Sequence, residues 1–148
     1  MVYGYVRIHS TDDEDAIESL IFQKIEIKRK YPKAEIVVEE WDILKSKKRP
    51  VFEEIVDKLV EGDVLVGAHF AELFISWSEA VNYIEKILDK GAIIHIPSIG
   101  KIDYSFDGKI NLSIAKNSAE VFFEANKRFF SILEQRMEEV KKGSKRRK

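Results

Sequence analysis

The sequence contains no cysteine, which excludes disulfide bonds, thiol catalysis and a thiolate zinc site. No apolar run approaches the roughly 20 residues that a membrane-spanning helix needs, so we expect no membrane partner. The sequence has no charged segment followed by an apolar stretch, which is the pattern of a signal peptide, so we expect a cytoplasmic protein. With only seven glycines, the chain has no phosphate loop, dinucleotide fingerprint or nucleophile elbow. We therefore expect no cofactor.

What is present describes a folded domain. The chain has 148 residues, of which 45% are hydrophobic, enough for one domain with a real core. Charged residues make up 34% of the chain and are rich in lysine and glutamate, a balance that hints at a thermophile.

The charge is unevenly distributed, because a net charge of −1 combines an acidic body with a basic end. Six of the 25 basic residues lie in the last eight positions, which leaves 19 basic against 26 acidic residues, a net of −7, over residues 1–140. The six are Lys141, Lys142, Lys145, Arg146, Arg147 and Lys148. We expect them to contact DNA phosphates, with a merely solubilising end as the alternative.

Strand and helix patterns alternate along the chain. Runs rich in β-branched residues predict strands at residues 2–8, 35–39, 63–70 and 92–96. Helical periodicity predicts helices at residues 12–30, 50–61 and 76–90. The first of these has an apolar stripe of Ile17, Leu20, Ile21 and Ile25. Gly62 is the expected left-handed residue after the second, and Ser76 with Glu79 matches a capping box before the third.

The last part of the body predicts a hairpin, because apolar residues alternate on both sides of Asp107-Gly108. A long helix is predicted over residues 113–142, which we assign to the same domain as the α/β body of residues 1–112, followed by a basic tail at 143–148. About thirty helical residues extend ~45 Å, longer than a body of this size can cover. We therefore expect a homodimer through helix 113–142; packing of this helix across its own sheet is the alternative.

The alternation of elements predicts a three-layer α/β fold with a mostly parallel sheet and helices on both faces. In such sheets, sites form at the carboxyl ends of the strands. Ser10 follows the first strand and could be a nucleophile if cations such as Arg7 and Arg49 activate it. The plain alternative is that Ser10 only caps the next helix.

The three histidines, His9, His69 and His95, follow or lie in three different predicted strands. If His9 and His69 are neighbours, Glu72 or Asp12 could complete a metal site. Separated histidines are more often incidental, so we expect no metal.

Several motifs along the chain resemble those of one enzyme family. The opening Tyr5-Val6-Arg7-Ile8-His9-Ser10-Thr11 is similar to a Y-x-R-V-S-T start, and Val60-Glu61-Gly62-Asp63-Val64-Leu65-Val66 resembles an E-G-D-V strand. Both belong to the catalytic domain of serine recombinases, the resolvase/invertase family. Arg49 matches the position of an active-site arginine of that family, residues 76–96 resemble its following helix and strand, and residues 113–142 its dimerisation helix.

The resemblance implies a flavodoxin/resolvase-like sheet of order 2-1-3-4-5. It also implies a serine that attacks a DNA phosphate and forms a covalent link, with arginines that hold the phosphate. By this resemblance the catalytic residues are Ser10, Arg7 and Arg49.

The sequence departs from the family pattern at the site. Aligned from Glu61-Gly62-Asp63, the family's L-D-R-L-x-R reads Phe70-Ala71-Glu72-Leu73-Phe74-Ile75, so an aspartate and two arginines are replaced. Glu72 would repel a phosphate. Ser10 comes one residue late, since His9 stands at the serine's position, and one step reverses the side chain unless a bulge intervenes. Since only the basic tail follows residue 142, we expect no counterpart of the family's C-terminal helix-turn-helix domain.

These departures predict a serine-recombinase-like domain that is inactive in strand transfer. We expect it to act as a dimeric, DNA-associated accessory or regulatory protein. One alternative is an active site-specific recombinase or nuclease that uses Ser10, or His9, placed by a bulge. Another is a small flavodoxin-like domain that binds a ligand or metal.

Overall fold

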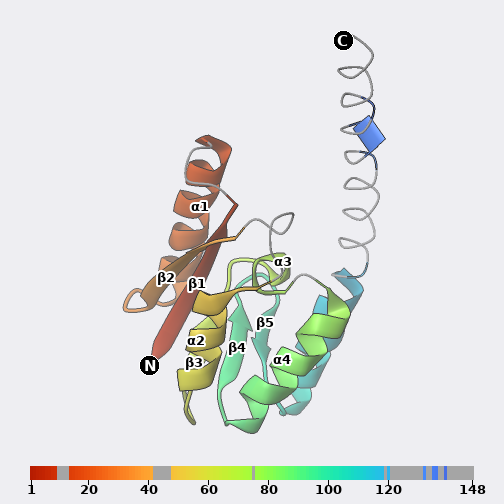
Figure 1. Ribbon diagram of the computed structural model, residues 1–148. Coiled ribbons are helices and arrows are strands. Elements are labelled where there is room, and N and C mark those ends of the chain that lie inside the picture. Colours follow the sequence, from red (N-terminus) through yellow and green to blue (C-terminus); the bar gives the residue numbers. More distant parts are fainter. Residues whose placement is uncertain are drawn as a thin grey trace, which may run out of the picture.

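The computed structural model describes residues 1–9, 14–41, 48–74 and 76–118, with single positions at 120, 132, 135, 136 and 139. Five strands form one sheet: β1 (Val2–Ile8), β2 (Glu35–Glu40), β3 (Val64–Val66), β4 (Ile93–Ile96) and β5 (Gly100–Ile102). Four helices accompany them: α1 (Glu14–Lys30), α2 (Pro50–Lys58), α3 (Phe70–Leu73) and α4 (Trp77–Asp89). Residues 106–118 are also helical, apart from the elements labelled in Figure 1.

The strand order is β2-β1-β3-β4-β5, which confirms the predicted order 2-1-3-4-5 and the α/β fold class. β1 is an inner strand that pairs in parallel with β2 and β3, and β3 pairs in parallel with β4. Only β5 runs antiparallel, beside β4. Because helices pack on both faces of the sheet, the apolar residues of β1 are buried on both faces, as the nearly continuous apolar run predicts.

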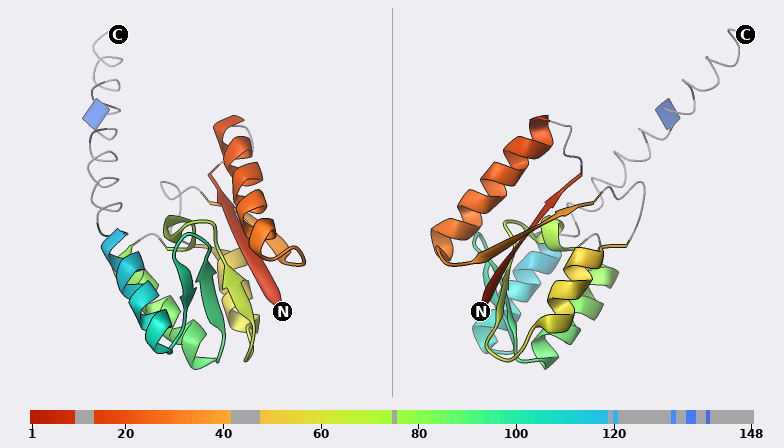
Figure 2. Two further views of the ribbon diagram at one scale, coloured as in Figure 1. Left: turned by 180° about the vertical axis from the view of Figure 1, so that it is seen from behind. Right: turned by 60° about the vertical axis from the view of Figure 1, so that its left-hand side comes forward.

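Helices cover both faces of the sheet, but unequally (Figure 2). On one face, α2, α4 and the helix at 106–118 contribute to a large core around Tyr5, Leu65 and Ile94. On the other face, α1 covers a smaller cluster in which Ile27 meets Val6 and Val66. The molecule therefore has a thick side, carrying α2 and α4, and a thin side, carrying α1.

The apolar stripe predicted for the first helix is wrong in its orientation. α1 turns Ala16, Gln23 and Ile27 towards the sheet. Ile17, Ile21 and Ile25 of the predicted stripe are 44%, 53% and 50% exposed. The reason lies in β1: a Cβ at Gly4 would come within 2.8 Å of Ile27, so the missing side chain admits Ile27.

Gln23 completes this contact through hydrogen bonds that an apolar residue could not make. Its Oε1 accepts from the backbone N–H of Arg7 at 3.2 Å, and its Nε2 donates to the Arg7 carbonyl at 2.9 Å. The polar residue is thus buried because it satisfies the backbone of β1.

The hairpin predicted around Asp107-Gly108 is also wrong, because residues 106–118 are helical. Ser105 caps this helix: its Oγ accepts from the backbone N–H of Gly108 at 3.0 Å. Gly108 approaches Asp103 so closely that a Cβ would clash with it. The glycine that suggests a turn instead allows a helix to begin. The hairpin that does form joins β4 and β5.

The predicted start of the third helix is confirmed, because the Ser76 side chain accepts from the backbone N–H of Glu79 at 3.2 Å. Gly62 has the predicted positive φ, 87°, but the predicted end of the second helix at this residue is wrong. α2 ends at Lys58 with Leu59 in an extended conformation, and Gly62 lies in the turn that leads to β3. Across the described ranges, no helix is long and apolar enough to span a bilayer. Most of the predicted helix 113–142 and all of the basic tail lie outside the described residues.

Candidate functional site: a guanidinium cluster closed by carboxylates

The two arginines singled out by the sequence both contact one indole ring. Arg7 is near the carboxyl end of β1, and Arg49 immediately precedes α2. Their guanidinium carbons lie 4.9 Å and 4.6 Å from the centroid of the Trp41 ring, which directly follows β2. Trp41 is 3% exposed. The site therefore forms where β1 and β2 end, as expected for an open α/β sheet.

The Arg49 side chain is enclosed, with 2% of it exposed. Its Nη1 donates to the Leu73 carbonyl and its Nη2 to Glu79 Oε1, both at 2.5 Å. The guanidinium also lies 4.0 Å from the centre of the Phe52 ring. A buried cation is tolerated only when it is paired and hydrogen-bonded, and here α3 and α4 supply both partners.

Arg7 is held by the residue that the family alignment places at a lost arginine. Its Nε donates to Glu72 Oε2 at 3.3 Å, with the side chains 24% and 18% exposed. Glu72 thus does more than repel a phosphate. It neutralises the cation that a phosphate would bind.

A third carboxylate occupies the beginning of α2. Glu39 is 3% exposed and accepts from the backbone N–H groups of Val51 at 2.8 Å and Phe52 at 3.2 Å. The first N–H groups of a helix are a natural site for an anion. Tyr5 also donates to Glu39 at 2.5 Å, and burial together with this hydrogen bond raises the pKa of the Tyr5 hydroxyl.

Three features that could hold a phosphate are therefore filled from within the chain. Glu72 pairs with Arg7, Glu79 with Arg49, and Glu39 with the N-terminus of α2. Within the described residues, no side-chain N or O atom that is buried lacks a hydrogen-bond partner. The arrangement can hold its cations in place, but it offers them to no outside anion as it stands.

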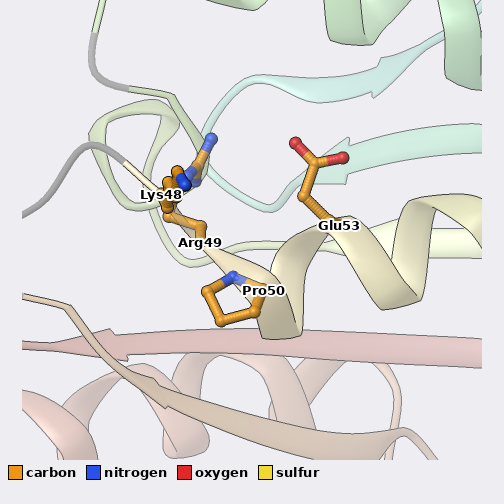
Figure 3. A pocket seen from close by; sticks show the side chains of 4 residues that line it. All are labelled: Lys48, Arg49, Pro50 and Glu53. Carbon is orange, nitrogen blue, oxygen red and sulfur yellow. The ribbon is translucent and has the colours of Figure 1, made fainter.

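A hollow of about 360 Å³ lies beside this cluster, lined by Lys48, Arg49, Pro50 and Glu53 (Figure 3). Glu53 accepts a hydrogen bond from the hydroxyl of Tyr83, a residue of α4. The lining mixes two cations with a carboxylate, so it carries no concentrated positive charge of the kind that recognises DNA.

The remaining predicted site residues are distributed as follows. Ser10 and the six basic residues Lys141, Lys142, Lys145, Arg146, Arg147 and Lys148 lie outside the described residues. His9 is exposed, and His69 stacks on Phe22 of α1 with ring centroids 5.9 Å apart. In the part of the chain that the structure describes, no three histidine or acidic side chains come together as a metal site.

His95 has a different neighbour. Its Nδ1 lies 2.5 Å from the Tyr31 hydroxyl, and its ring is 4% exposed. Burial, and then the nearby Lys30 and Lys101, lower the His95 pKa below its usual value. Burial also raises the pKa of Tyr31. His95 lies on β4 and Tyr31 directly follows α1, so this pair belongs to other elements than the arginine cluster.

The sequence analysis did not predict that Glu39 and Trp41 belong to the cluster, nor that Glu79 pairs with Arg49. Glu79 is recognised only as part of a capping box, yet its carboxylate turns to Arg49. A signal for the others exists, because Glu39 and Trp41 are a carboxylate and an aromatic ring at the carboxyl end of a strand beside β1. Only the strand pairing shows that they face the arginines.

Comparison with known proteins gives a consistent picture. The family model described as "Resolvase, N terminal domain" matches residues 2–145. A crystal structure of a resolvase family site-specific recombinase from Streptococcus pneumoniae matches with a TM-score of 0.53 and 22% sequence identity. The match covers 95% of this chain and 97% of that one. At that identity the likeness concerns the fold. No curated protein matches.

Proposed function

Because this chain belongs to the resolvase family and has the fold of a serine recombinase catalytic domain, we propose that it is a DNA-associated, dimeric accessory or regulatory protein without strand-transfer activity. Its place of action is the cytoplasm.

The observation that carries the proposal is the state of Arg49. Strand transfer by a serine needs free guanidinium groups that meet the phosphate as charge develops on it. The Arg49 guanidinium is buried, lies against the rings of Trp41 and Phe52, and donates to Leu73 and Glu79.

Exchange of these partners for a phosphate carries a large cost. Separation of a buried ion pair costs on the order of 3–5 kcal/mol, because one charge is left without its partner. Arg7 would have to leave Glu72 as well. A phosphate that approached both arginines would also meet the negative charges of Glu72, Glu79 and Glu39. The retained arginines are therefore structural groups that hold strand ends, α3 and α4 together.

Dimer formation is supported by the beginning of the C-terminal helical region. Phe106, Ile110 and Ile114 follow at intervals of four, and they are 78%, 44% and 47% exposed. Ala115, on the opposite side, is fully buried in the core. An apolar stripe that the body leaves uncovered is suited to a second copy, and residues 113–142 continue this pattern in sequence.

DNA association rests on the six basic residues between Lys141 and Lys148. Each phosphate that a lysine or arginine neutralises releases a counterion, so binding should weaken steeply with salt. Deletion of residues 141–148 should then abolish most DNA binding by the full chain. Binding that is unchanged by the deletion would contradict this role of the tail.

The catalytic part of the proposal is tested on supercoiled DNA by a search for a covalent protein–DNA adduct. We expect none from the wild-type chain or from Ser10→Ala. The alternative function, an active recombinase or nuclease that uses Ser10, requires Glu72 and Glu79 to release the arginines. An adduct that forms with the wild type and disappears with Ser10→Ala would establish that alternative and refute the proposal.

A further inference from the structure

Helix α1 carries an apolar ridge that the body leaves uncovered. Ile17, Ile21 and Ile25 recur every four residues and are 44%, 53% and 50% exposed. On its other side, α1 contacts the sheet through Ala16, Gln23 and Ile27. Among the helices that the structure describes, α1 is the one on the thin side of the sheet in Figures 1 and 2. Three exposed isoleucines in a row are costly in water and suit a protein interface.

The residues around this ridge are arranged symmetrically about Ile21. Ile17 comes four residues before Ile21, and Ile25 comes four residues after it. In the same way, Glu18 and Lys24 lie three residues before and after Ile21, and Glu14 and Lys28 lie seven residues before and after it. At 3.6 residues per turn, the members of these pairs lie about 40°, 60° and 20° to either side of Ile21 around the helix axis. All four charged residues are exposed.

This pattern is self-complementary. If two α1 helices meet antiparallel across a two-fold axis at Ile21, each Ile17 faces an Ile25, each Glu18 faces a Lys24, and each Glu14 comes beside a Lys28. The acidic first half of one helix then lies against the basic second half of the other. A two-fold contact needs a patch that complements itself in this way.

We propose that α1 is a homotypic interface, at which a second copy of this chain packs its own α1 across a two-fold axis through Ile21. The isoleucines form a ridge with a spacing of four, and across the axis Ile21 meets its own equivalent while Ile17 meets Ile25. Glu18 and Lys24 supply direction, because a parallel arrangement would place like charges together. Lys28 contributes less, since its Nζ already donates to the carbonyls of Ala34 at 2.7 Å and Pro32 at 3.2 Å.

This interface is separate from the dimer proposed through residues 113–142 and does not depend on it. The exposed stripe of Phe106, Ile110 and Ile114 belongs to a helix on the thick side, whereas α1 is on the thin side. A chain that used both surfaces would link dimers into larger assemblies. The α1 contact is therefore tested by variants of α1 alone.

The first experiment uses the absence of cysteine from the chain. Ile21→Cys introduces a single thiol on the proposed axis, where two copies bring equivalent positions within the reach of a disulfide. The matched control is Val60→Cys, at an apolar position that is similarly exposed, 61% against 53%, in the connection between α2 and β3. Under mild oxidation of the full chain, Ile21→Cys should form a disulfide-linked dimer at least about 10-fold faster than Val60→Cys. Equal rates would overturn the proposal.

The second experiment reverses charges and follows assembly size by sedimentation. Glu18→Lys and Lys24→Glu, made singly, each turn two attractions into two repulsions, and each should weaken the association on the order of 10-fold. The double variant restores opposite charges and should recover the wild-type association. Because the four charged positions are exposed, these variants should remain folded. Single variants that leave the association unchanged, or a double variant as weak as the singles, would overturn the proposal. A failure of the C-terminal dimer alone would leave the ratios between these variants unaltered.

Discussion

The two faces of the sheet differ in how completely their side chains are buried and paired. On the thick side, the rings of Trp41, Phe52 and Tyr83 lie against Arg49, and every polar group of the cluster has a partner in the chain. On the thin side, α1 buries only three of its residues and leaves a ridge of isoleucines in water. At the position of the family's active site, the arginines are paired with carboxylates of the same chain. On the opposite face, the apolar ridge of α1 is exposed to solvent.

The difference indicates where partners can act. A cluster whose charges are already neutralised gains little from an outside anion, because each new contact must first break an old one. An exposed apolar ridge gains from any partner that covers it. Interaction should therefore concentrate on helix surfaces, and the arginine cluster should contribute stability.

We expect the largest loss of stability when the carboxylate that pairs with Arg49 on the thick side is removed. Glu79→Ala leaves the buried Arg49 guanidinium without its carboxylate, and it should lower the free energy of unfolding by about 3–5 kcal/mol. Glu85→Ala, at an exposed position of the same helix, should change it by less than about 0.5 kcal/mol. Urea unfolding of the two variants gives the comparison. Equal effects would mean that Arg49 does not depend on Glu79.

The next effect separates the two faces of α1. Ile27→Ala removes the side chain that fills the space above Gly4, and it should cost about 2–5 kcal/mol in unfolding free energy. Ile21→Ala, six residues earlier, should cost less than about 0.5 kcal/mol at a concentration where the chain is monomeric. A large cost for Ile21→Ala would show that its ridge is covered within one chain.

A smaller effect tests how closely α1 approaches β1. In Gly4→Ala, the new Cβ would lie within 2.8 Å of both Ile27 and Ile36, so overpacking should cost about 1–3 kcal/mol in thermal or urea unfolding. Addition of Ile36→Val, which removes the Cδ1 that the new Cβ would meet at 2.8 Å, should recover part of that loss. If the two losses simply add, the close approach is not the cause.

The smallest effect is a pH dependence on the thin side. Burial lowers the His95 pKa in the folded chain, so the unfolded chain binds the proton more readily. His95 therefore supports the fold fully above its unfolded pKa of about 6.5, and this support declines as the pH falls below that value. Protonation of Nδ1 would also end its role as acceptor for the Tyr31 hydroxyl. Unfolding free energies measured from pH 7 to 5 should fall more steeply for the wild type than for His95→Phe. Equal slopes would contradict this.

Much of the fold follows from sequence pattern alone. The helices with Phe52, Ile55 and Val56, or with Ala80 and Ile84, bury the residues that their periodicity selects. Periodicity fails for α1 because two local facts outweigh it. Gly4 admits Ile27, and Gln23 is buried since it binds the β1 backbone. The burial of a polar residue such as Gln23 cannot be predicted from the sequence unless the group to which it hydrogen-bonds is known.

The candidate site was predictable in part. Arg7, Arg49 and the charge reversal at Glu72 can be found by motif, and the structure brings all three to one place. The carboxylate that matters most, Glu79, comes 30 residues after Arg49, and only the folded arrangement of α3 and α4 joins them. The hairpin prediction failed for a related reason: Asp107-Gly108 suits a turn, but the Ser105 cap and the contact of Gly108 with Asp103 favour a helix.

The central claim, that carboxylates hold both arginines where the family would hold a phosphate, has one direct measurement. In Trp77→Phe, Trp41 is the remaining tryptophan and contacts both guanidinium groups, so its fluorescence reports on them. Titration of Trp77→Phe with a short phosphodiester, with chloride at equal ionic strength as the control, should give no saturable change in Trp41 fluorescence. The double variant Trp77→Phe/Glu72→Gln should give a saturable change, because Arg7 no longer has its carboxylate partner. A saturable, phosphodiester-specific change with Glu72 and Glu79 both in place would contradict the account.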